Sequence, residues 1–371
     1  MKKIKVMTIF GTRPEAIKMA PLIKELKRNE NIETIVCVTA QHREMLDQVL
    51  KIFEIIPDYD LNIMKQGQTL SDITTRALIG LEEIIKKEQP NIVLVHGDTT
   101  TTFAGALAAY YNQVDVGHVE AGLRTGNKYS PYPEEVNRQM VGILADMNFA
   151  PTEVSYNNLI KENKNKDSIY ITGNTVIDAM KTTVKDDYYH DVFDWVKNDR
   201  MILLTAHRRE NLGEPMKRIF KAIKKIVLEF DDVKVVYPIH LNPKVRSIAN
   251  EVFEGCDKVK LIEPLEVIDF HNFQNKSYII LTDSGGIQEE APSLGKPVLV
   301  LRDTTERPEG IKAGTLKLVG TDEDTIYEET KKLLEDKNEY NKMANASNPY
   351  GDGFASERIV KAIIEKYQNF E

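Results

Sequence analysis

The stretch IKVMTIFGTRPEAIK, residues 4–18, predicts a buried β-strand that turns directly into a helix. Residues 4–10 form a short, largely apolar run, which is typical of a parallel strand covered on both faces. Gly11 permits a tight turn after the strand, and Pro14 suits the first turn of a helix. The backbone amides of such a turn face the carboxyl edge of the sheet, where open α/β sheets bind ligands.

The same strand–loop–helix pattern recurs along the chain. Residues 70–87 place apolar side chains on one helical face, with Thr69 or Ser71 as the N-cap and Pro90 beyond the end. Alternating strands and helices indicate parallel sheets with helices on both faces. Further helices are predicted at residues 217–230, 326–334 and 356–367. Further strands are predicted at residues 34–39, 92–95, 114–119, 148–150, 201–205, 233–237, 279–282 and 297–301.

A chain of 371 residues is long for a single core and favours two domains. The seam is predicted near residues 171–174, and the charged, aromatic stretch 181–200 is interpreted as the helical exit from the first domain. The predicted fold class is therefore α/β, with two Rossmann-like doubly wound domains at 1–172 and 173–355. The C-terminal helix, residues 356–371, is expected to pack back on the first domain.

Composition argues against several functional classes. The formal net charge is −8 and no basic stripe is present, which disfavours nucleic acid as a partner. No apolar run approaches the roughly 20 residues of a membrane span, so no membrane partner is expected. The N-terminal MKKIKVMTIFG is too short in its apolar part for a secretory signal, which predicts a cytoplasmic protein. Cys37 and Cys256 lack metal-ligand spacing and are interpreted as idle thiols.

Missing motifs narrow the chemistry further. The sequence has no G-x-G-x-x-G after a strand, no Walker loop, no H-E-x-x-H, no paired C-x-x-C and no G-x-S-x-G. A tightly bound nicotinamide, an NTPase and a zinc hydrolase are therefore disfavoured.

Three carboxylates lie near the ends of predicted strands in the first half. Asp98 and Glu120 each follow a strand, and Glu134 opens a helix. Each has an ordinary local explanation, because Asp98 suits a helix N-cap, Glu120 has Arg124 as a nearby partner, and acids favour helix starts. Three acids at one sheet edge also suit acid–base chemistry.

Cations and small residues at other strand ends predict binding of a phosphorylated ligand. Arg13 and Lys18 suit a diphosphate, although a capped helix start with two surface cations explains them equally well. In the second half, His207 directly follows a strand. The segment 284–286, Ser-Gly-Gly, opens a helix and forms a phosphate nest, with Glu290 one turn later placed for ribose hydroxyls.

Taken together, these segments resemble the non-hydrolysing UDP-N-acetylglucosamine 2-epimerase family over essentially the whole chain. Several long strings in one order make the resemblance specific. They are GTRPEAIKMAPL (11–22), HGDTTTTFAGALAA (96–109), HVEAGLRTG (118–126), YSPYPEEVNRQ (129–139), TAHRREN (205–211), DSGGIQEEAPSLGKPVLVLRDTTERPEG (283–310) and NPYGDGFASERI (348–359).

The resemblance implies roles for individual residues. The implied catalytic residues are Asp98, Glu120, Glu134 and His207. The implied substrate contacts are Arg13, Lys18, Asp98, Glu120, Arg138 and His207, the phosphate nest Ser284, Gly285 and Gly286, the ribose acid Glu290, the ligand arginine Arg307, Phe270 at the uracil, and Leu265 through its main chain.

A second pocket, at which substrate activates many bacterial relatives, is implied by Gln41, Arg208 and His240. Two other positions of that pocket depart from the family, because Glu44 and Gly67 stand where a glutamine and an arginine are expected.

The resemblance also implies a glycosyltransferase-B-type architecture, with two domains facing a cleft, and a homodimer without nicotinamide or metal. The implied partners are UDP-N-acetylglucosamine, UDP-N-acetylmannosamine and UDP. The implied reaction inverts C2 by eliminating UDP to 2-acetamidoglucal and adding it back. The alternatives are a hydrolysing 2-epimerase that releases N-acetylmannosamine, a glycosyltransferase of the same architecture using a UDP-sugar donor, and a non-catalytic nucleotide-sugar sensor.

Overall fold

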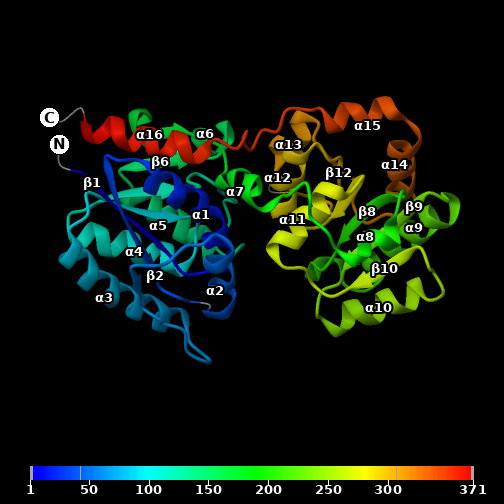
Figure 1. The fold of residues 1–371 in the computed structure, drawn as a ribbon, viewed down its shortest axis with the longest axis horizontal. Coiled ribbons are helices and arrows are strands. Elements are labelled where there is room, and N and C mark those ends of the chain that lie inside the picture. The colour runs from blue at the N-terminus through cyan, green and yellow to red at the C-terminus, as the bar shows by residue number, and fades with distance from the viewer. Residues whose placement is uncertain (1–2, 42, 306, 369–371) are drawn as a thin grey trace. The chain divides into compact units, whose positions relative to one another are not determined.

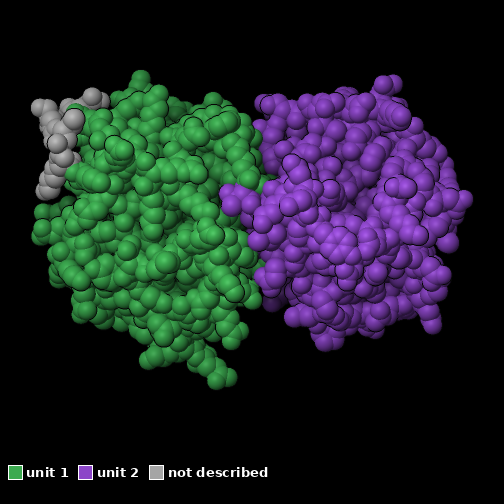
Figure 2. Space-filling model, viewed as in Figure 1, with its two compact units in different colours: residues 1–181, 350–371 green, residues 182–349 purple. Residues whose placement is uncertain are grey.

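The computed structural model describes residues 3–41, 43–305 and 307–368, so residues 1–2 and 369–371 of the predicted segments lie outside the described residues. The chain forms two compact units, coloured separately in Figure 2. Unit 1 comprises residues 1–181 and 350–371, and unit 2 comprises residues 182–349. The chain thus leaves unit 1 shortly after the seam predicted from the sequence, because most of the helix that follows the seam packs in unit 1.

Within the described residues, unit 1 contains a seven-stranded, entirely parallel sheet in the order β3-β2-β1-β4-β5-β6-β7 (Figure 1). Its strands are β1 (Ile4–Phe10), β2 (Ile32–Val38), β3 (Tyr59–Asp60), β4 (Ile92–His96), β5 (Asp115–Val119), β6 (Met147–Ala150) and β7 (Ile169–Ile171). Its helices are α1 (Arg13–Arg28), α2 (Arg43–Ile52), α3 (Leu70–Glu88), α4 (Thr100–Tyr111), α5 (Glu134–Leu144), α6 (Glu153–Lys161), α7 (Thr175–Thr183) and α16 (Ala355–Gln368).

Side-chain alternation along β1 explains why both faces of this sheet are covered. Val6 and Phe10 pack against α1, α2 and α16 on one face, whereas Met7 and Ile9 pack against α3, α4 and α5 on the other. All four side chains are fully buried. A strand that is apolar on both faces requires helices on both faces, and β1 therefore fixes the three-layer arrangement.

The C-terminal helix α16 completes unit 1. Ile359 and Ile363 are fully buried in the same cluster as Leu22 and Leu26 of α1. The Tyr367 hydroxyl donates a hydrogen bond to a carboxylate oxygen at the start of β5, with 2.6 Å between the two oxygens. The last fourteen described helical residues therefore belong to the fold of unit 1, although the chain reaches them only after unit 2.

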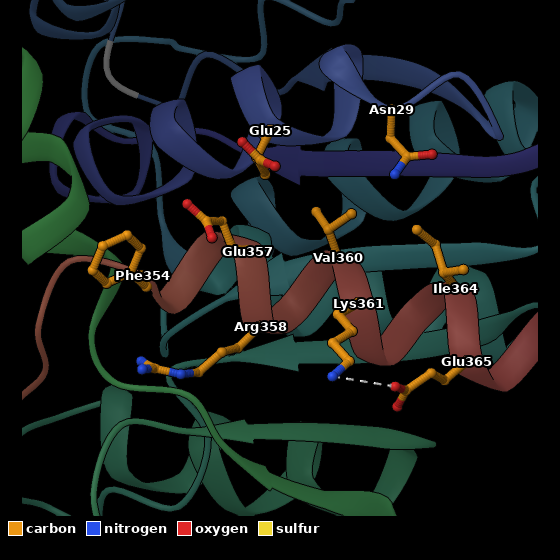
Figure 3. Close-up of a pocket in the computed structure, with 9 residues that line it drawn as sticks. All are labelled: Glu25, Asn29, Phe354, Glu357, Arg358, Val360, Lys361, Ile364 and Glu365. Atoms are coloured by element: carbon orange, nitrogen blue, oxygen red, sulfur yellow. Dashed lines mark ion pairs between the residues drawn. The ribbon is translucent and has the colours of Figure 1, made fainter.

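An open groove runs along α1 and α16, with charged side chains along its rim (Figure 3). Lys361 and Glu365 form an ion pair of 3.7 Å there. The described residues that line it are Glu25, Asn29, Phe354, Glu357, Arg358, Val360, Lys361, Ile364 and Glu365. None of these lining residues was predicted as a site residue, so the groove is a separate feature of unit 1.

The described part of unit 2 carries a six-stranded parallel sheet in the order β10-β9-β8-β11-β12-β13. Helices α9, α10 and α14 cover one face, and α8, α11 and α12 cover the other. The strands are β8 (Arg200–Thr205), β9 (Val233–Pro238), β10 (Val259–Ile262), β11 (Ile279–Thr282), β12 (Val298–Val300) and β13 (Leu316–Leu318). The helices are α8 (Asp191–Val196), α9 (Glu214–Glu229), α10 (Pro243–Phe253), α11 (Val267–Lys276), α12 (Gly285–Glu290), α13 (Pro308–Ala313), α14 (Glu323–Glu335) and α15 (Lys337–Ala344).

Both sheets reverse their strand order at their centres. In unit 1 the reversal lies between β1 and β4, and in unit 2 it lies between β8 and β11. Loops leave the sheet in opposite directions at such a point and open a crevice at the carboxyl ends of the strands, where ligands bind. The fold therefore singles out two pairs of loops, one in each unit.

The α/β prediction of two Rossmann-like doubly wound folds is confirmed. The strand prediction missed β3, β7, β10 and β13, which are the four edge strands of the two sheets. Edge strands bury less surface, and these four are only two to four residues long, so they lack the longer continuous apolar run of a central strand. No helix within the described ranges is long and apolar enough to cross a membrane.

Truncating a buried α16 side chain tests its contribution to unit 1. We expect Ile363→Ala to lower the free energy of unfolding by about 2–5 kcal/mol, because it removes a fully buried side chain and leaves a cavity. Ile79→Ala on α3, where the side chain is 55% exposed, should change it by less than about 0.5 kcal/mol. Urea unfolding measures both; equal effects of the two variants would contradict the packing of α16.

Candidate functional site

The loop between β1 and α1 is held in close contact with its neighbours. A Cβ atom at Gly11 would lie 2.0 Å from the Thr39 hydroxyl oxygen and 2.7 Å from that of Thr101, so only glycine fits. The two threonine hydroxyls are hydrogen-bonded to each other at 2.9 Å. This packing places the predicted ligand residue Arg13 at the first position of α1.

Glu15 is the internal anchor of that loop and was missed as a functional residue. Its buried carboxylate accepts hydrogen bonds from the Gly11 and Thr12 amides, at 3.1 and 2.8 Å, and from the Thr12 hydroxyl at 2.7 Å. It also accepts from the hydroxyls of Thr99 and Thr102 at the start of α4, at 2.7 and 3.0 Å. Burial raises the pKa of Glu15 although these bonds lower it. The Thr-x-x-Glu capping-box pattern at 12–15 was the available signal.

Asp98 does not cap α4, and that interpretation was wrong. Thr99 is the N-cap, and its hydroxyl accepts from the Thr102 amide at 3.1 Å. The Asp98 carboxylate instead accepts from Nε and Nη2 of Arg138, at 2.9 and 2.6 Å. Arg138 also pairs with the buried Glu135 at 3.2 Å. Because Thr99 caps α4, the Asp98 carboxylate near the end of β4 is available to pair with Arg138 of α5.

Glu120 adopts a left-handed backbone conformation, with φ of 65°. This region is unfavourable for residues with a side chain and is often found at functional sites. The Glu120 carboxylate forms an ion pair with Lys18 and accepts a 2.9 Å hydrogen bond from the side-chain amide of Asn174. Arg124 pairs with Glu162 at 2.7 Å, so the local partner suggested for Glu120 was wrong.

Two buried histidines flank this acid. His96 Nε2 lies 3.8 Å from the Glu120 carboxylate, and burial lowers the pKa of His96 to about 3. His118 Nε2 lies 2.7 Å from the Gly97 carbonyl oxygen, and burial lowers its pKa to about 4. Both rings are neutral near pH 7, because desolvation outweighs the neighbouring carboxylate. Lys18 therefore supplies positive charge beside Glu120 that the two neutral rings do not.

Glu134 is the first residue of α5. Its Oε2 atom is buried and makes no hydrogen bond to any described residue. Buried carboxylate oxygens are normally satisfied, and an unsatisfied one requires an explanation such as a catalytic role. Glu134 is thus distinct from Glu135 beside it, whose carboxylate accepts from the amides of Thr125 and Gly126 at 3.0 and 3.1 Å.

Asp283 plays the anchoring role in unit 2 and was not predicted as a site residue. Its buried carboxylate accepts hydrogen bonds from the amides of His207 and Arg208, both at 2.8 Å. The side-chain amide of Asn211 donates to the same oxygen at 3.2 Å. The loop after β11 thus fixes the loop after β8 at the centre of the sheet.

His207 and His240 stack face to face, with ring centroids 5.2 Å apart and planes within 5° of parallel. Burial lowers the pKa of His207, and His240 and Arg208 lower it further, whereas Asp283 at 3.5 Å raises it. His207 is therefore a neutral proton donor or acceptor near neutral pH.

The predicted phosphate and ribose residues gather around the start of α12. A Cβ atom at Gly285 would lie 3.7 Å from the Arg307 guanidinium carbon, and one at Gly286 would lie 3.5 Å from Oε1 of Glu290. Arg307 pairs with the buried Glu289 at 2.5 Å. Gln274 of α11 donates to the Glu290 carboxylate at 2.8 Å. Ser284, at the N-cap of α12, completes this group.

The remaining predicted residues fall into two places. Phe270 and Leu265 are half-buried against the same apolar cluster of unit 2. Gln41 lies in unit 1, where its side-chain oxygen accepts from the Thr101 hydroxyl at 3.0 Å beside the Gly11 loop. Its predicted companions Arg208 and His240 belong to unit 2. The second pocket therefore stays a prediction.

Comparison with known proteins decides the family. The family model described as UDP-N-acetylglucosamine 2-epimerase matches residues 24–364. A UDP-N-acetylglucosamine 2-epimerase of Bacillus subtilis (strain 168) is 69% identical over 367 residues, covering 99% of this chain and 97% of that protein. The chain belongs to the UDP-N-acetylglucosamine 2-epimerase family.

Solved structures of this 2-epimerase family share the fold. A putative UDP-N-acetylglucosamine 2-epimerase from Listeria monocytogenes superposes with a TM-score of 0.96 at 57% identity, covering 100% of this chain and 98% of that chain. The UDP-GlcNAc 2-epimerase from Neisseria meningitidis bound to UDP-GlcNAc has a TM-score of 0.86 at 52% identity, covering 97% and 100%. The predicted family is therefore confirmed over the full length of the chain.

The buried histidines give a direct test of the electrostatics around Glu120. We expect His96 and His118 to stay neutral down to about pH 4 in the folded protein, whereas the unfolded chain takes up protons near pH 6.5. Because both folded pKa values are lowered, their stabilising effect is complete above pH 6.5 and is lost as the pH falls toward 4 and then 3. Imidazole ¹⁵N NMR, assigned with His96→Gln and His118→Gln, measures this. A midpoint near 6.5 in the folded state would show that the rings are solvated.

Proposed function

We propose that this family member interconverts UDP-N-acetylglucosamine and UDP-N-acetylmannosamine by eliminating UDP to 2-acetamidoglucal and adding it back, without hydrolysis. The observation that carries the proposal is the Glu120 carboxylate, which is 9% exposed at a strand end and contacts Lys18 and Asn174, on a residue with a left-handed backbone conformation. Asp98 and Glu134 lie on neighbouring elements of the same unit. Such a group of acids suits removal and return of a carbon-bound proton.

The chemistry of C2 supports elimination. No carbonyl activates the C2 proton within the sugar ring, so an enzyme must either oxidise the sugar transiently or let the leaving group depart. The sequence has no dinucleotide-binding fingerprint. Departure of UDP leaves oxocarbenium character on the sugar, which nearby carboxylates stabilise, as they do in glycoside hydrolysis.

Asp98, Glu120 and Glu134 then divide the proton transfers. One carboxylate removes the C2 proton, and another returns a proton to the opposite face of the glucal. Oε2 of Glu134 accepts no hydrogen bond from a described residue, whereas the Asp98 carboxylate accepts from Arg138. Such different surroundings can give two carboxylates different pKa values and therefore different catalytic roles. His207, a neutral imidazole near pH 7, is the further proposed catalytic group.

The residues of unit 2 suit the nucleotide. In the proposal, the diphosphate is bound by the amides and hydroxyl of Ser284–Gly286 together with Arg13, Arg307 and His207. These donors stabilise the negative charge that develops on the diphosphate as its bond to C1 of the sugar breaks. Glu290 binds the ribose hydroxyls, and Phe270 and Leu265 form the uracil pocket. Lys18 and Arg138 complete the proposed substrate contacts.

Several properties extend the proposal. The chain acts as a homodimer in the cytoplasm, binds UDP-N-acetylglucosamine, UDP-N-acetylmannosamine and UDP, and uses neither nicotinamide nor metal. Gln41, Arg208 and His240 contribute to a second pocket for substrate. The names of the relatives support the substrate, because the Bacillus protein is called a UDP-N-acetylglucosamine 2-epimerase and the Neisseria structure is bound to UDP-GlcNAc.

Isotope exchange tests the reaction. In D₂O without an acceptor, we expect deuterium at C2 of the product and, because the steps are reversible, also at C2 of the recovered substrate. Proton NMR of one sample follows both and detects any released N-acetylmannosamine. Free N-acetylmannosamine as the main product would instead establish a hydrolysing enzyme, and unchanged substrate without exchange would establish a binding protein or a transferase.

Removing the charge of Glu120 tests the acid. Glu120→Gln should lower turnover by about 10²–10⁴-fold, the range for a general acid–base group, while UDP binding changes little. The matched control is Glu162→Gln, which removes an exposed acid paired with Arg124 and should leave turnover near that of the parent protein. Calorimetry with UDP and the exchange assay provide the two readouts. Parental turnover in Glu120→Gln would remove Glu120 from the catalytic set.

A further inference from the structure

We infer that Asn174 is a positioning residue that fixes the Glu120 carboxylate for proton transfer through its side-chain amide. The inference rests on the proposed function, in which Glu120 is catalytic. Asn174 lies in the turn between β7 and α7, far from Glu120 in sequence, and the residue is 3% exposed. It approaches the acid from an element other than those that carry the predicted catalytic residues.

The hydrogen bonds of Asn174 define which way its amide points. The side-chain oxygen accepts from the Val176 backbone amide at 3.0 Å. The side-chain nitrogen therefore faces Glu120 and donates to Oε2 at 2.9 Å. Reversing the amide would set an acceptor against the carboxylate and a donor against a backbone N–H, which costs both bonds. The Asn174 side chain is thus an oriented donor.

Asn174 is itself fixed by the backbone. The backbone N–H of Asn174 donates to the Tyr350 carbonyl oxygen at 2.7 Å, at the point where the chain returns to unit 1. Gly173 and Gly351 pass so closely that a Cβ on Gly173 would lie 3.2 Å from the Gly351 Cα, and both residues have positive φ. Two segments separated by the whole of unit 2 in sequence therefore meet at Asn174 and fix the backbone that carries the donor.

The other groups facing Glu120 do not provide the same constraint. Lys18 of α1 supplies charge from the end of a flexible side chain. His96 of β4 lies 3.8 Å away, and His118 of β5 interacts electrostatically with Glu120. Among the contacts described for that carboxylate, the Asn174 side chain donates a 2.9 Å hydrogen bond from a residue whose own backbone is hydrogen-bonded to Tyr350.

Two substitutions of Asn174 separate a positioning role from a structural one. Asn174→Asp keeps the acceptor for Val176 and the size of the side chain, but it replaces the donor to Glu120 with a negative charge. Asn174→Ala removes both bonds. A structural role predicts that aspartate is tolerated and alanine is damaging, since aspartate caps such turns well. A positioning role predicts the reverse order for turnover.

The expected kinetics follow from the lost bond. Asn174→Ala should lower kcat by about 10–100-fold, the equivalent of one hydrogen bond to a charged group, and Asn174→Asp should lower it further. UDP affinity by calorimetry should stay within about threefold in both, because Asn174 is not among the proposed contacts to UDP. Thermal unfolding should rank the variants the other way, with Asn174→Asp closer to the parent.

The matched control is Asn158→Ala. Asn158 donates its side-chain amide to the Gly122 carbonyl at 3.0 Å, so it supports the loop that follows Glu120 without touching the carboxylate. Asn158→Ala should lower the midpoint of thermal unfolding and keep kcat within about threefold, because the lost hydrogen bond does not reach the Glu120 carboxylate.

The outcomes are distinct. Near-parental kcat and C2 exchange in Asn174→Asp, with exchange abolished in Glu120→Gln, would overturn the positioning role and leave the proposed function standing. A parent protein without C2 exchange would overturn both. Loss of kcat in Asn174→Asp beyond that in Asn174→Ala, with UDP affinity and folding retained, would support the inference.

Discussion

One constraint organises both halves of the molecule: a carboxylate buried at the centre of a parallel sheet must find hydrogen-bond donors there. In unit 1, Glu15 takes its donors from the loop after β1 and from the start of α4, which follows β4. In unit 2, Asp283, directly after β11, takes its donors from the loop after β8. These strand pairs are the points where the strand orders reverse. Each buried acid therefore joins the two loops that border the position where open α/β sheets generally bind ligands.

The energetics explain why this arrangement makes rigid loops. Removing an ionised carboxylate from water costs several kcal/mol, and only well-aligned donors offset that cost. Glu15 uses five donors, and the loop amides cannot move without leaving the acid unsatisfied. The predicted ligand and catalytic residues, among them Arg13, Asp98 and His207, stand on these loops. Loops held in this way provide the preorganisation that electrostatic catalysis requires.

Sequence patterns predicted the central strands and the family, but they placed side chains poorly wherever a distant partner displaced a near one. The sequence predicted Asp98 as a helix N-cap, but Thr99 caps α4 in the structure. The Asp98 carboxylate instead pairs with Arg138, which lies forty residues later in the chain. Arg124 turned to Glu162 instead of Glu120. Local rules assume that neighbours in sequence are the available partners. At a sheet edge, however, parallel strands bring together residues that the sequence keeps far apart, and no periodicity records which pairs will form.

The contacts of Glu120 combine two kinds of donor that respond differently to a change of charge. Lys18 stabilises the carboxylate because it is charged, and it therefore opposes protonation of the acid. The Asn174 amide is neutral and can donate to an oxygen of either the carboxylate or the carboxylic acid. His96, kept neutral by burial, adds no further positive charge. In the proposed mechanism, an acid that takes up and gives back a proton in each turnover needs a partner that stays in position in both protonation states. A neutral, backbone-anchored amide meets that requirement in a way that a second cation would not.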